Sequence, residues 1–258
     1  MLNEMKIEIS LEEPLEKSAA RYFERSKKSK RKLEGAKKAL LLTKEMLLRT
    51  EKTTKQKAAV KPKPKSEWYE KFRWFFSSKN KLVILGRDAT TNEIIIKKHT
   101  EKHDIVFHAE TAKSPFCVVK LYGNPLDEDT KLEAAIATAA YSSAWKAGLT
   151  SSDVFMVKPE QVSKKAPSGE YLTKGAFMIY GKKEFITVQI ELAIGVTKEG
   201  KIMCAPISAV QAHCDKYKLL VPGREKSSAI AKKLQKILGY DWLDDIIRAL
   251  PAGGCELR

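Results

Sequence analysis

An unbroken apolar run, a glycine and a polar cap stand in succession in the first half of the chain, and this order restricts the local fold. The run spans residues 82–85 and is as continuous as a strand covered on both faces. Gly86 ends it, and Asp88 or Thr90 can then cap a helix, because Thr90 and Glu93 have the spacing of a capping box. The segment therefore predicts a buried strand, a tight turn and a helix.

The N-terminus of such a helix can bind an anion, because its first N–H groups lack partners and the helix dipole is positive there. Arg87 stands beside this predicted N-terminus. A capped helix that merely follows a strand is the ordinary structural interpretation, and anion binding is the functional one.

Aromatic and basic residues alternate just before this unit. Their spacing predicts a helix over residues 67–76 with one apolar face in the core, formed by Trp68, Phe72, Phe75 and Phe76. Tyr69, Arg73 and Trp74 fall on other faces. Because a base that stacks on an aromatic ring gains roughly 1–3 kcal/mol, Tyr69 and Trp74 are candidates for base stacking.

The rest of the chain mixes strand and helix patterns without regular alternation. The predicted strands lie near 82–86, 104–108, 116–121, 153–157, 175–180, 185–196, 201–205 and 217–221. The predicted helices lie near 89–99, 131–147, 207–213, 226–238 and 241–249, and Pro222-Gly223 reads as a turn. This pattern predicts an α+β (irregular α/β) fold, with a mixed β-sheet packed by helices and preceded by a long basic heptad helix.

The heptad helix is predicted from the first quarter of the chain. Pro14 suits a first helical turn, and apolar or small residues then step alternately by four and three. The seam consists of Leu15, Ala19, Tyr22, Ser26, Ser29, Leu33, Ala36, Leu40, Thr43 and Leu47. We therefore expect a basic coiled-coil helix over 1–56, a Lys/Pro linker over 57–66 and a folded domain over 67–258, with a homodimer through the seam as a possible assembly.

The charge of the chain favours a polyanionic partner. The chain carries 48 Lys and Arg against 32 Asp and Glu, a net charge of +16. Nucleic acid is the first candidate and an acidic membrane surface the second. The four cysteines show no C-x-x-C pair, and no run is long enough to span a membrane. These features predict buried thiols and a cytoplasmic protein without a membrane segment or cofactor.

Three separated segments resemble the RNA-binding domain of the NFACT family, whose members act in ribosome-associated quality control. They are W-Y-E-K-F-R-W-F with G-R-D-A-x-x-N-E from Trp68 to Glu93, H-D-I-V-F-H-A from His103 to Ala109, and S-G-E-Y-L-T-K-G-A-F-M-I-Y-G-K from Ser168 to Lys182. The basic helix resembles the coiled-coil region of this family. The large N-terminal domain that is usual in the family has no counterpart here, and the loop Ala109 to Ser114 departs from the family pattern.

The resemblance implies a non-catalytic RNA-binding protein whose partners are tRNA, rRNA and the large ribosomal subunit. Together with the basic clusters it points to a set of RNA-binding residues: Arg73, Arg87, Asp88, Asn92, Glu93, Lys97, Lys98, Lys102, Lys113, Lys174, Lys182 and Lys183. We expect Arg87→Glu to weaken RNA binding without lowering the melting temperature. Equal loss of fold and binding would mean that Arg87 is structural.

Two other functions stay open at this point. An RNA-modifying enzyme, or the subunit that delivers its RNA, would need a pocket joining Asp88, Asn92, Glu93, His103 and His108. A metal site would need His99, His103 and His108 with Glu93 and Asp104, although the predicted helix ends before it could align these histidines. A structural assembly factor would use the heptad helix to dimerise and the basic surface only for solubility.

Overall fold

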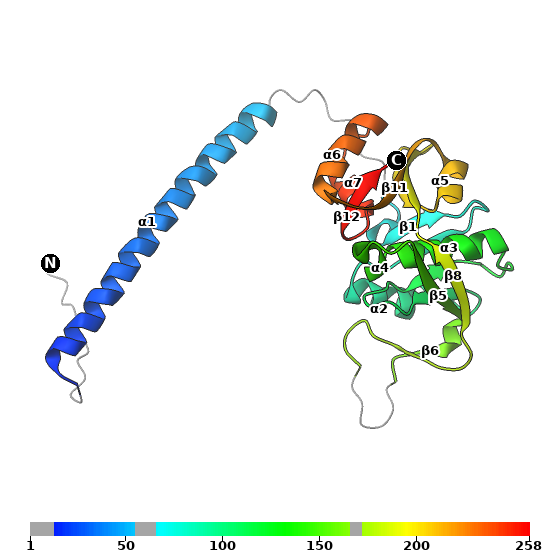
Figure 1. The fold of residues 1–258 in the computed structure, drawn as a ribbon, viewed down its shortest axis with the longest axis horizontal. Coiled ribbons are helices and arrows are strands. Elements are labelled where there is room, and N and C mark those ends of the chain that lie inside the picture. Colours follow the sequence, from blue (N-terminus) through cyan, green and yellow to red (C-terminus); the bar gives the residue numbers. More distant parts are fainter. Residues whose placement is uncertain (1–12, 55–65, 166–171) are drawn as a thin grey trace. The chain divides into compact units, whose positions relative to one another are not determined.

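A computed structural model of the chain describes residues 13–54, 66–165 and 172–258 (Figure 1). The chain divides into two compact units, Met1–Lys63 and Pro64–Arg258, which we describe separately. Apart from Ser66, the predicted linker over 57–66 lies outside the described residues.

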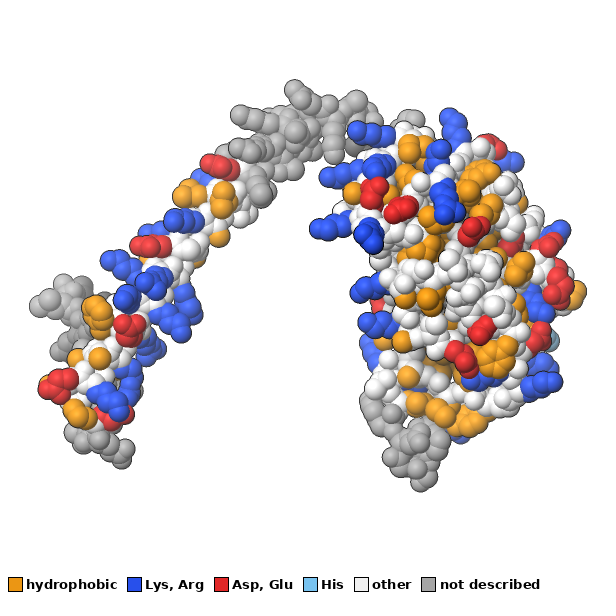
Figure 2. All heavy atoms as spheres, in the orientation of Figure 1, with side chains coloured by type: hydrophobic (Ala, Val, Ile, Leu, Met, Phe, Trp, Pro, Cys, Tyr) orange, Lys and Arg blue, Asp and Glu red, His pale blue; other side chains and the backbone are white. Residues whose placement is uncertain are grey.

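The first unit contains one helix, α1 (Leu15–Thr54), of 40 residues, and the predicted long helix is confirmed. Along the part of the helix whose side chains are described, residues 15–45, the apolar side chains of the predicted seam are exposed, Leu33 at 56% and Leu40 at 71% of their surface. Lysines and arginines cover much of the rest of the helix (Figure 2). Most helical stability in proteins comes from packing, so we expect the exposed apolar seam of this helix to pack against a partner.

The second unit contains a six-stranded sheet in the order β1-β2-β4-β3-β5-β8 and a four-stranded sheet in the order β10-β9-β11-β12. The first sheet is built from β1 (Arg73–Phe76), β2 (Leu82–Leu85), β3 (Ile105–Ala109), β4 (Cys117–Val119), β5 (Ser151–Val157) and β8 (Glu184–Gln189). The second is built from β9 (Leu192–Thr197), β10 (Ile202–Ala205), β11 (Cys214–Lys226) and β12 (Gly254–Leu257). A small pair joins β6 (Val162–Ser163) and β7 (Met178–Ile179).

Helices cover these sheets (Figure 1). They are α2 (Ala89–Lys98), α3 (Glu128–Ala140), α4 (Ser143–Ala147), α5 (Ile207–His213), α6 (Ser227–Leu238) and α7 (Leu243–Ala249), with short 3-10 turns η1 (Trp68–Lys71) and η2 (Pro159–Gln161). Helix α3 packs on β3, β4, β5 and β8, while α6 packs on β11 and β12. The α+β class is therefore confirmed. All strand pairs in the described part of the chain are antiparallel, so the expected mixed sheet is wrong in that respect.

Strand β2 shows why the unit folds in layers. Val83 and Leu85 point into the core shared with α3, whereas Leu82 and Ile84 point into a second core that includes Ile95 of α2. Each of these side chains is almost completely buried, which contributes roughly 1.5–3 kcal/mol per residue. The continuous apolar run is therefore a strand covered on both faces, as predicted.

The predicted thiol environment is confirmed. All four cysteines are buried and unpaired. Burial raises the pKa of Cys117 and of Cys204 to about 12, and that of Cys214 and of Cys255 to about 11. No helix among the described residues is both long and apolar enough to cross a membrane.

Three element predictions are wrong. The predicted helix over 67–76 is the turn η1 followed by strand β1, because residues 73–76 pair antiparallel with β2. The predicted helix over 131–147 is two helices, since the Ser142 side chain caps α4. The predicted strand over 185–196 is also two, β8 and β9, which belong to different sheets.

The C-terminal part differs as well. Pro222 and Gly223 lie inside the long strand β11, where a register shift between Pro222 and Glu225 absorbs the irregular backbone, so they do not form a separate turn. Strand β12 was not predicted from the sequence, because its residues G-C-E-L begin at the second of two successive glycines and carry little apolar pattern.

Candidate nucleic-acid interface

The segments that resemble the NFACT motifs meet at the start of helix α2. Gly175, in the third segment, has a φ of +78°, and a Cβ atom there would lie 2.5 Å from the Cα atom of Ala89, in the first segment. The Gly175 amide also donates a hydrogen bond to Glu93 Oε2 over 3.3 Å. The loop over residues 172–177 therefore packs directly on the N-terminus of α2.

A row of rings connects the second segment to the same place. The rings of His108 and Phe116 lie 4.5 Å apart, and Phe116 meets Phe177 edge to face at 5.2 Å. Burial lowers the pKa of His108 to about 4, so its imidazole is neutral at physiological pH and serves as a packing ring. The three segments are separate in sequence and adjacent in space.

Lys164, which follows β6, contacts the residues of the third segment that lead into β7. Its ammonium donates hydrogen bonds to the carbonyl oxygens of Thr173 and Ala176, over 2.9 and 3.0 Å. It also lies 5.1 Å from the centre of the Phe177 ring and 3.9 Å from Glu93 Oε2. Residues 166–171, between these anchors, lie outside the described residues.

Two predicted site residues build the N-terminus of α2. The Asp88 carboxylate caps the helix by accepting a hydrogen bond from the Thr91 amide over 2.8 Å, and this bond lowers the pKa of Asp88. The capping box pairs Asp88 with Thr91, so the expected Thr90–Glu93 box is wrong. Asn92 Oδ1 accepts a hydrogen bond from the amide of Phe116 over 3.1 Å, which connects α2 to the residue just before β4.

Two predicted arginines point inward. Arg73 donates to the Gly86 carbonyl oxygen over 2.9 Å and stacks 4.7 Å from the Tyr141 ring, and burial lowers its pKa. Arg87 donates to the carbonyl oxygens of Phe72 and Arg248, over 2.8 and 2.6 Å. Burial, with the neighbouring arginine charges, lowers the pKa of Arg87 to about 10. Both guanidiniums therefore join backbone segments.

The contacts of Arg87 change the expectation for its replacement. Arg87→Glu would leave two carbonyl oxygens without their donor and place a carboxylate beside them, and a lost bond to a charged group costs about 1.5–3 kcal/mol. We expect the melting temperature to fall together with RNA affinity. Differential scanning calorimetry checks this, and an unchanged melting temperature would restore the sequence-based expectation that Arg87 serves RNA alone.

The predicted lysines lie mostly at the surface. Lys97, Lys98, Lys102, Lys113, Lys174 and Lys182 are exposed, although Lys97 pairs with Glu93 over 2.6 Å. Lys183 is half-buried, with its ammonium 4.4 Å from the centre of the Phe155 ring and 3.9 Å from Glu110. Lys174 adjoins Gly175 and acts electrostatically on Asp88 at the N-terminus of α2, while Lys97 and Lys98 lie in the last turn of that helix and Lys102 follows it. We call this set of exposed lysines the α2 lysine face. It comprises Lys97, Lys98, Lys102 and Lys174.

The groups considered for metal binding or catalysis are engaged elsewhere. His99 stacks on Trp68 with ring centres 4.7 Å apart, and Asp104 pairs with Lys120 in the interior. Within the described ranges, no three His, Cys, Asp or Glu side chains lie close enough to hold a metal ion. Sequence reasoning missed Lys164 and Gly175 as organisers of the interface. A glycine between lysine and alanine in the third segment was the available signal.

The chain matches known proteins over this region. A family model described as the NFACT protein RNA binding domain matches residues 71–181. The archaeal Rqc2 homolog aRqcH of Methanocaldococcus jannaschii is 45% identical over 197 residues, which cover 74% of this chain and 29% of that protein. The human ribosome quality control complex subunit NEMF is 39% identical over 174 residues, which cover 66% of this chain and 16% of that protein.

The chain spans less than a third of the length of these relatives. A solved structure, the C-terminal part of the fibronectin/fibrinogen-binding protein from Streptococcus suis, is 18% identical, with a TM-score of 0.39 over 54% of this chain and 52% of that one. That likeness is too weak to carry an argument. The family model and the identities to aRqcH and NEMF agree, and the chain belongs to the NFACT family through its RNA-binding domain.

Proposed function

We propose that this chain is a non-catalytic RNA-binding protein that holds structured RNA through the α2 lysine face. The observation that carries the proposal is the packing of the third segment on α2, which brings Lys174 beside the N-terminus of that lysine-bearing helix. Lysines contact phosphates without reading sequence, so binding would depend on charge and shape. Lys113, Lys182 and Lys183 extend the proposed contact surface, whereas Arg73, Arg87, Asp88, Asn92 and Glu93 act by building it.

The RNA that we propose is tRNA or large-subunit rRNA. Several curated relatives are named as ribosome quality control subunits, and the family resemblance implies tRNA together with the large ribosomal subunit. A function on ribosomes would take place in the cytoplasm. The basic helix α1 would supply a second contact, since its lysines and arginines between residues 17 and 44 are exposed.

The salt dependence of binding tests this proposal. If five or six phosphates are neutralised, log affinity should fall against log salt with a slope of about −4, at about −0.7 per phosphate for single strands. Replacing Lys98, Lys102 and Lys174 by Glu should make this slope less steep by about 2, at about 0.7 per lost contact. Fluorescence anisotropy with labelled tRNA at several salt concentrations measures both.

The matched control changes the same charge elsewhere. Lys216, Lys232 and Lys236 are exposed and lie on β11 and α6. Replacing these three by Glu changes the net charge by the same amount as the α2 variant. Because the three lysines lie outside the proposed interface, this control variant should keep a salt slope closer to that of the parent protein. Affinity that is insensitive to salt, or equal losses in the two triple variants, would contradict the proposed interface.

The exposed seam of α1 leads to a prediction about assembly. We propose that two copies pair through Leu33, Leu40 and the other seam residues, loosely because Ser26 and Ser29 interrupt it. Light scattering should show dimers that increase with concentration and disappear in the Leu33→Glu/Leu40→Glu variant. A strict monomer with residues 15–54 fully protected from hydrogen exchange would contradict this pairing.

A further inference from the structure

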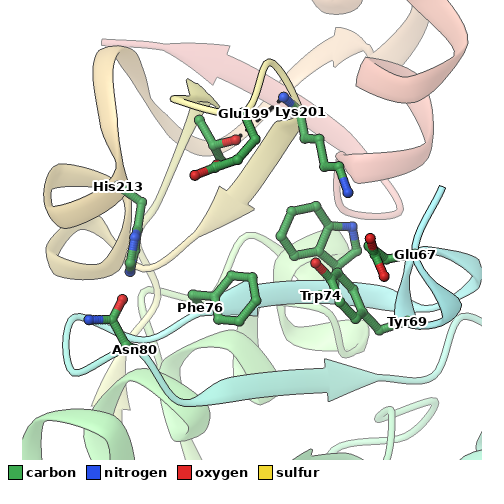
Figure 3. Close-up of a pocket in the computed structure, with 9 residues that line it drawn as sticks. Glu67, Tyr69, Trp74, Phe76, Asn80, Glu199, Lys201 and His213 are labelled. Carbon is green, nitrogen blue, oxygen red and sulfur yellow. Dashed lines mark hydrogen bonds between the residues drawn. The ribbon is translucent and has the colours of Figure 1, made fainter. Parts of the chain in front are cut away.

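An aromatic cavity of about 390 Å³ lies between the two main sheets, apart from the α2 lysine face (Figure 3). Tyr69 from η1 and Trp74 and Phe76 from β1 form one wall. The opposite side comes from the β9–β10 turn, with Glu199 and Lys201. A cavity of this size falls in the range of small-molecule sites, which is about 300–1,000 Å³.

The aromatic wall is continuous. The ring centres of Tyr69 and Trp74 lie 5.0 Å apart, and those of Trp74 and Phe76 lie 5.9 Å apart. Tyrosine and tryptophan usually hydrogen-bond their polar atoms when they are buried. Here the Tyr69 hydroxyl and the Trp74 indole N–H contact no hydrogen-bond acceptor among the described residues. The wall therefore offers ring surface together with two polar atoms available to a ligand.

The rim of the cavity supplies hydrogen-bond acceptors. The carboxylates of Glu67 and Glu199 lie there with the amide of Asn80. A hydrogen bond from Thr197 is the main cause that lowers the pKa of Glu199, so this carboxylate is ionised at physiological pH. Two carboxylates disfavour an anionic ligand inside the cavity and favour one that carries N–H donors.

A cationic ligand is also disfavoured, because a cation of the chain already lines the cavity. The Lys201 ammonium lies 5.9 Å from the centre of the Tyr69 ring and is held by the Glu70 carboxylate. A second cation would meet this charge. A neutral planar heterocycle with N–H groups is repelled neither by the carboxylates nor by the Lys201 ammonium. Unpaired RNA bases are heterocycles of this kind, and proteins recognise them by stacking on aromatic rings and by hydrogen bonds to their edges.

We propose that this cavity binds one unpaired nucleobase that carries an exocyclic amine, with its face on the Tyr69–Trp74 wall and its amine donating to Glu199 or Glu67. The inference rests on the proposed RNA binding and adds a base-reading site that is separate from the α2 lysine face, which would contact only phosphates. Lys71 and Lys198 are exposed next to the cavity residues in sequence, where they can neutralise the flanking phosphates. The phosphates stay outside while the base enters.

Binding of short single-stranded oligonucleotides to the full chain tests the site. One probe contains 2-aminopurine in a cytosine-rich strand, and its fluorescence should be quenched on binding, because the base stacks on a ring. Tyr69→Ala should lower affinity for single strands by about 5- to 100-fold, the loss expected when a stacking ring is removed. Tyr69→Phe keeps the ring and should keep most of the affinity. A blunt RNA duplex without unpaired bases should bind equally to all three proteins.

Base preference provides a second readout that does not depend on removing a ring. Uracil lacks an exocyclic amine, so oligo(C) should bind more tightly than oligo(U), by about fivefold or more. Glu199→Gln should reduce this preference with no loss of melting temperature, because Glu199 is exposed.

The outcomes separate this inference from the proposed function. If duplex and single strands both bind, but 2-aminopurine stays bright and Tyr69→Ala has no effect, the base site is refuted and RNA binding stands. If no RNA binds at any salt concentration, the proposed function fails first.

Discussion

Replacement of Asp104 by alanine is expected to destabilise the folded unit by about 3 kcal/mol, since breaking a buried ion pair leaves an uncompensated charge. The Asp104 and Lys120 side chains are only 1% and 3% exposed. Asp104 also accepts hydrogen bonds from the amides of Glu101 and Leu121, over 2.7 and 3.2 Å. For a domain of this size, the melting temperature should fall by roughly 10 °C, which calorimetry measures.

A double variant serves as the control for Asp104. Asp104→Leu/Lys120→Met removes both charges, and replacing a buried pair by apolar side chains is often neutral. We therefore expect the double variant to recover much of the stability that Asp104→Ala loses. A single variant that melts within 2 °C of the parent, an allowance of about 1 kcal/mol, would mean that Glu101 alone can satisfy Lys120.

Replacement of Gly175 by alanine is expected to release the third segment from α2 without unfolding the sheets. A left-handed backbone costs a non-glycine residue about 1–2 kcal/mol, and the added Cβ would also collide with the Ala89 backbone. A total of about 3 kcal/mol would raise local opening about 100-fold. Hydrogen exchange of residues 172–180 should report this increase, and RNA affinity should fall because Lys174 loses its place beside α2.

Gly123→Ala is a control that separates the cost of a left-handed backbone from the collision of the added Cβ atom with a neighbouring residue. Gly123 also has a left-handed φ, of +84°, yet a Cβ atom there would meet nothing within 4 Å. This control should show only the conformational cost and no loss of RNA affinity. Equal effects of the two alanine variants on hydrogen exchange around residues 172–180 would rule out the contact with Ala89 as the cause.

Sequence predicted the elements whose residues satisfy one pattern alone. The run over 82–85 is a buried strand, as its continuous apolar pattern predicts, and helix α5 matches its predicted bounds. The aromatic segment over 67–76 satisfied two patterns, because nearly continuous rings fit helical spacing and strand propensity alike. Residues 73–76 form a strand because they pair with β2, and a short stretch of sequence does not reveal which segment will be its pairing partner.

The sequence indicated which types of residue form the candidate site, but it did not show which of them are exposed to a ligand and which hold the fold together. The lysines at 97, 98, 102 and 174 are exposed, as charge clustering suggests. Arg73 and Arg87 carry the same charge but donate to backbone carbonyl oxygens, and only the fold reveals those acceptors. Gly175 shows the same limit, since its neighbour Ala89 is distant in sequence.

The environment of the four cysteines has a practical consequence for measuring these interactions. The thiolate is the reactive form of cysteine, and the raised pKa values of about 11 and 12 leave very little of it near neutral pH. A cysteine introduced at an exposed position, as in Lys102→Cys, would therefore react with a maleimide long before the native thiols. Site-specific dyes or spin labels can thus be attached to the native background, without first preparing a cysteine-free protein.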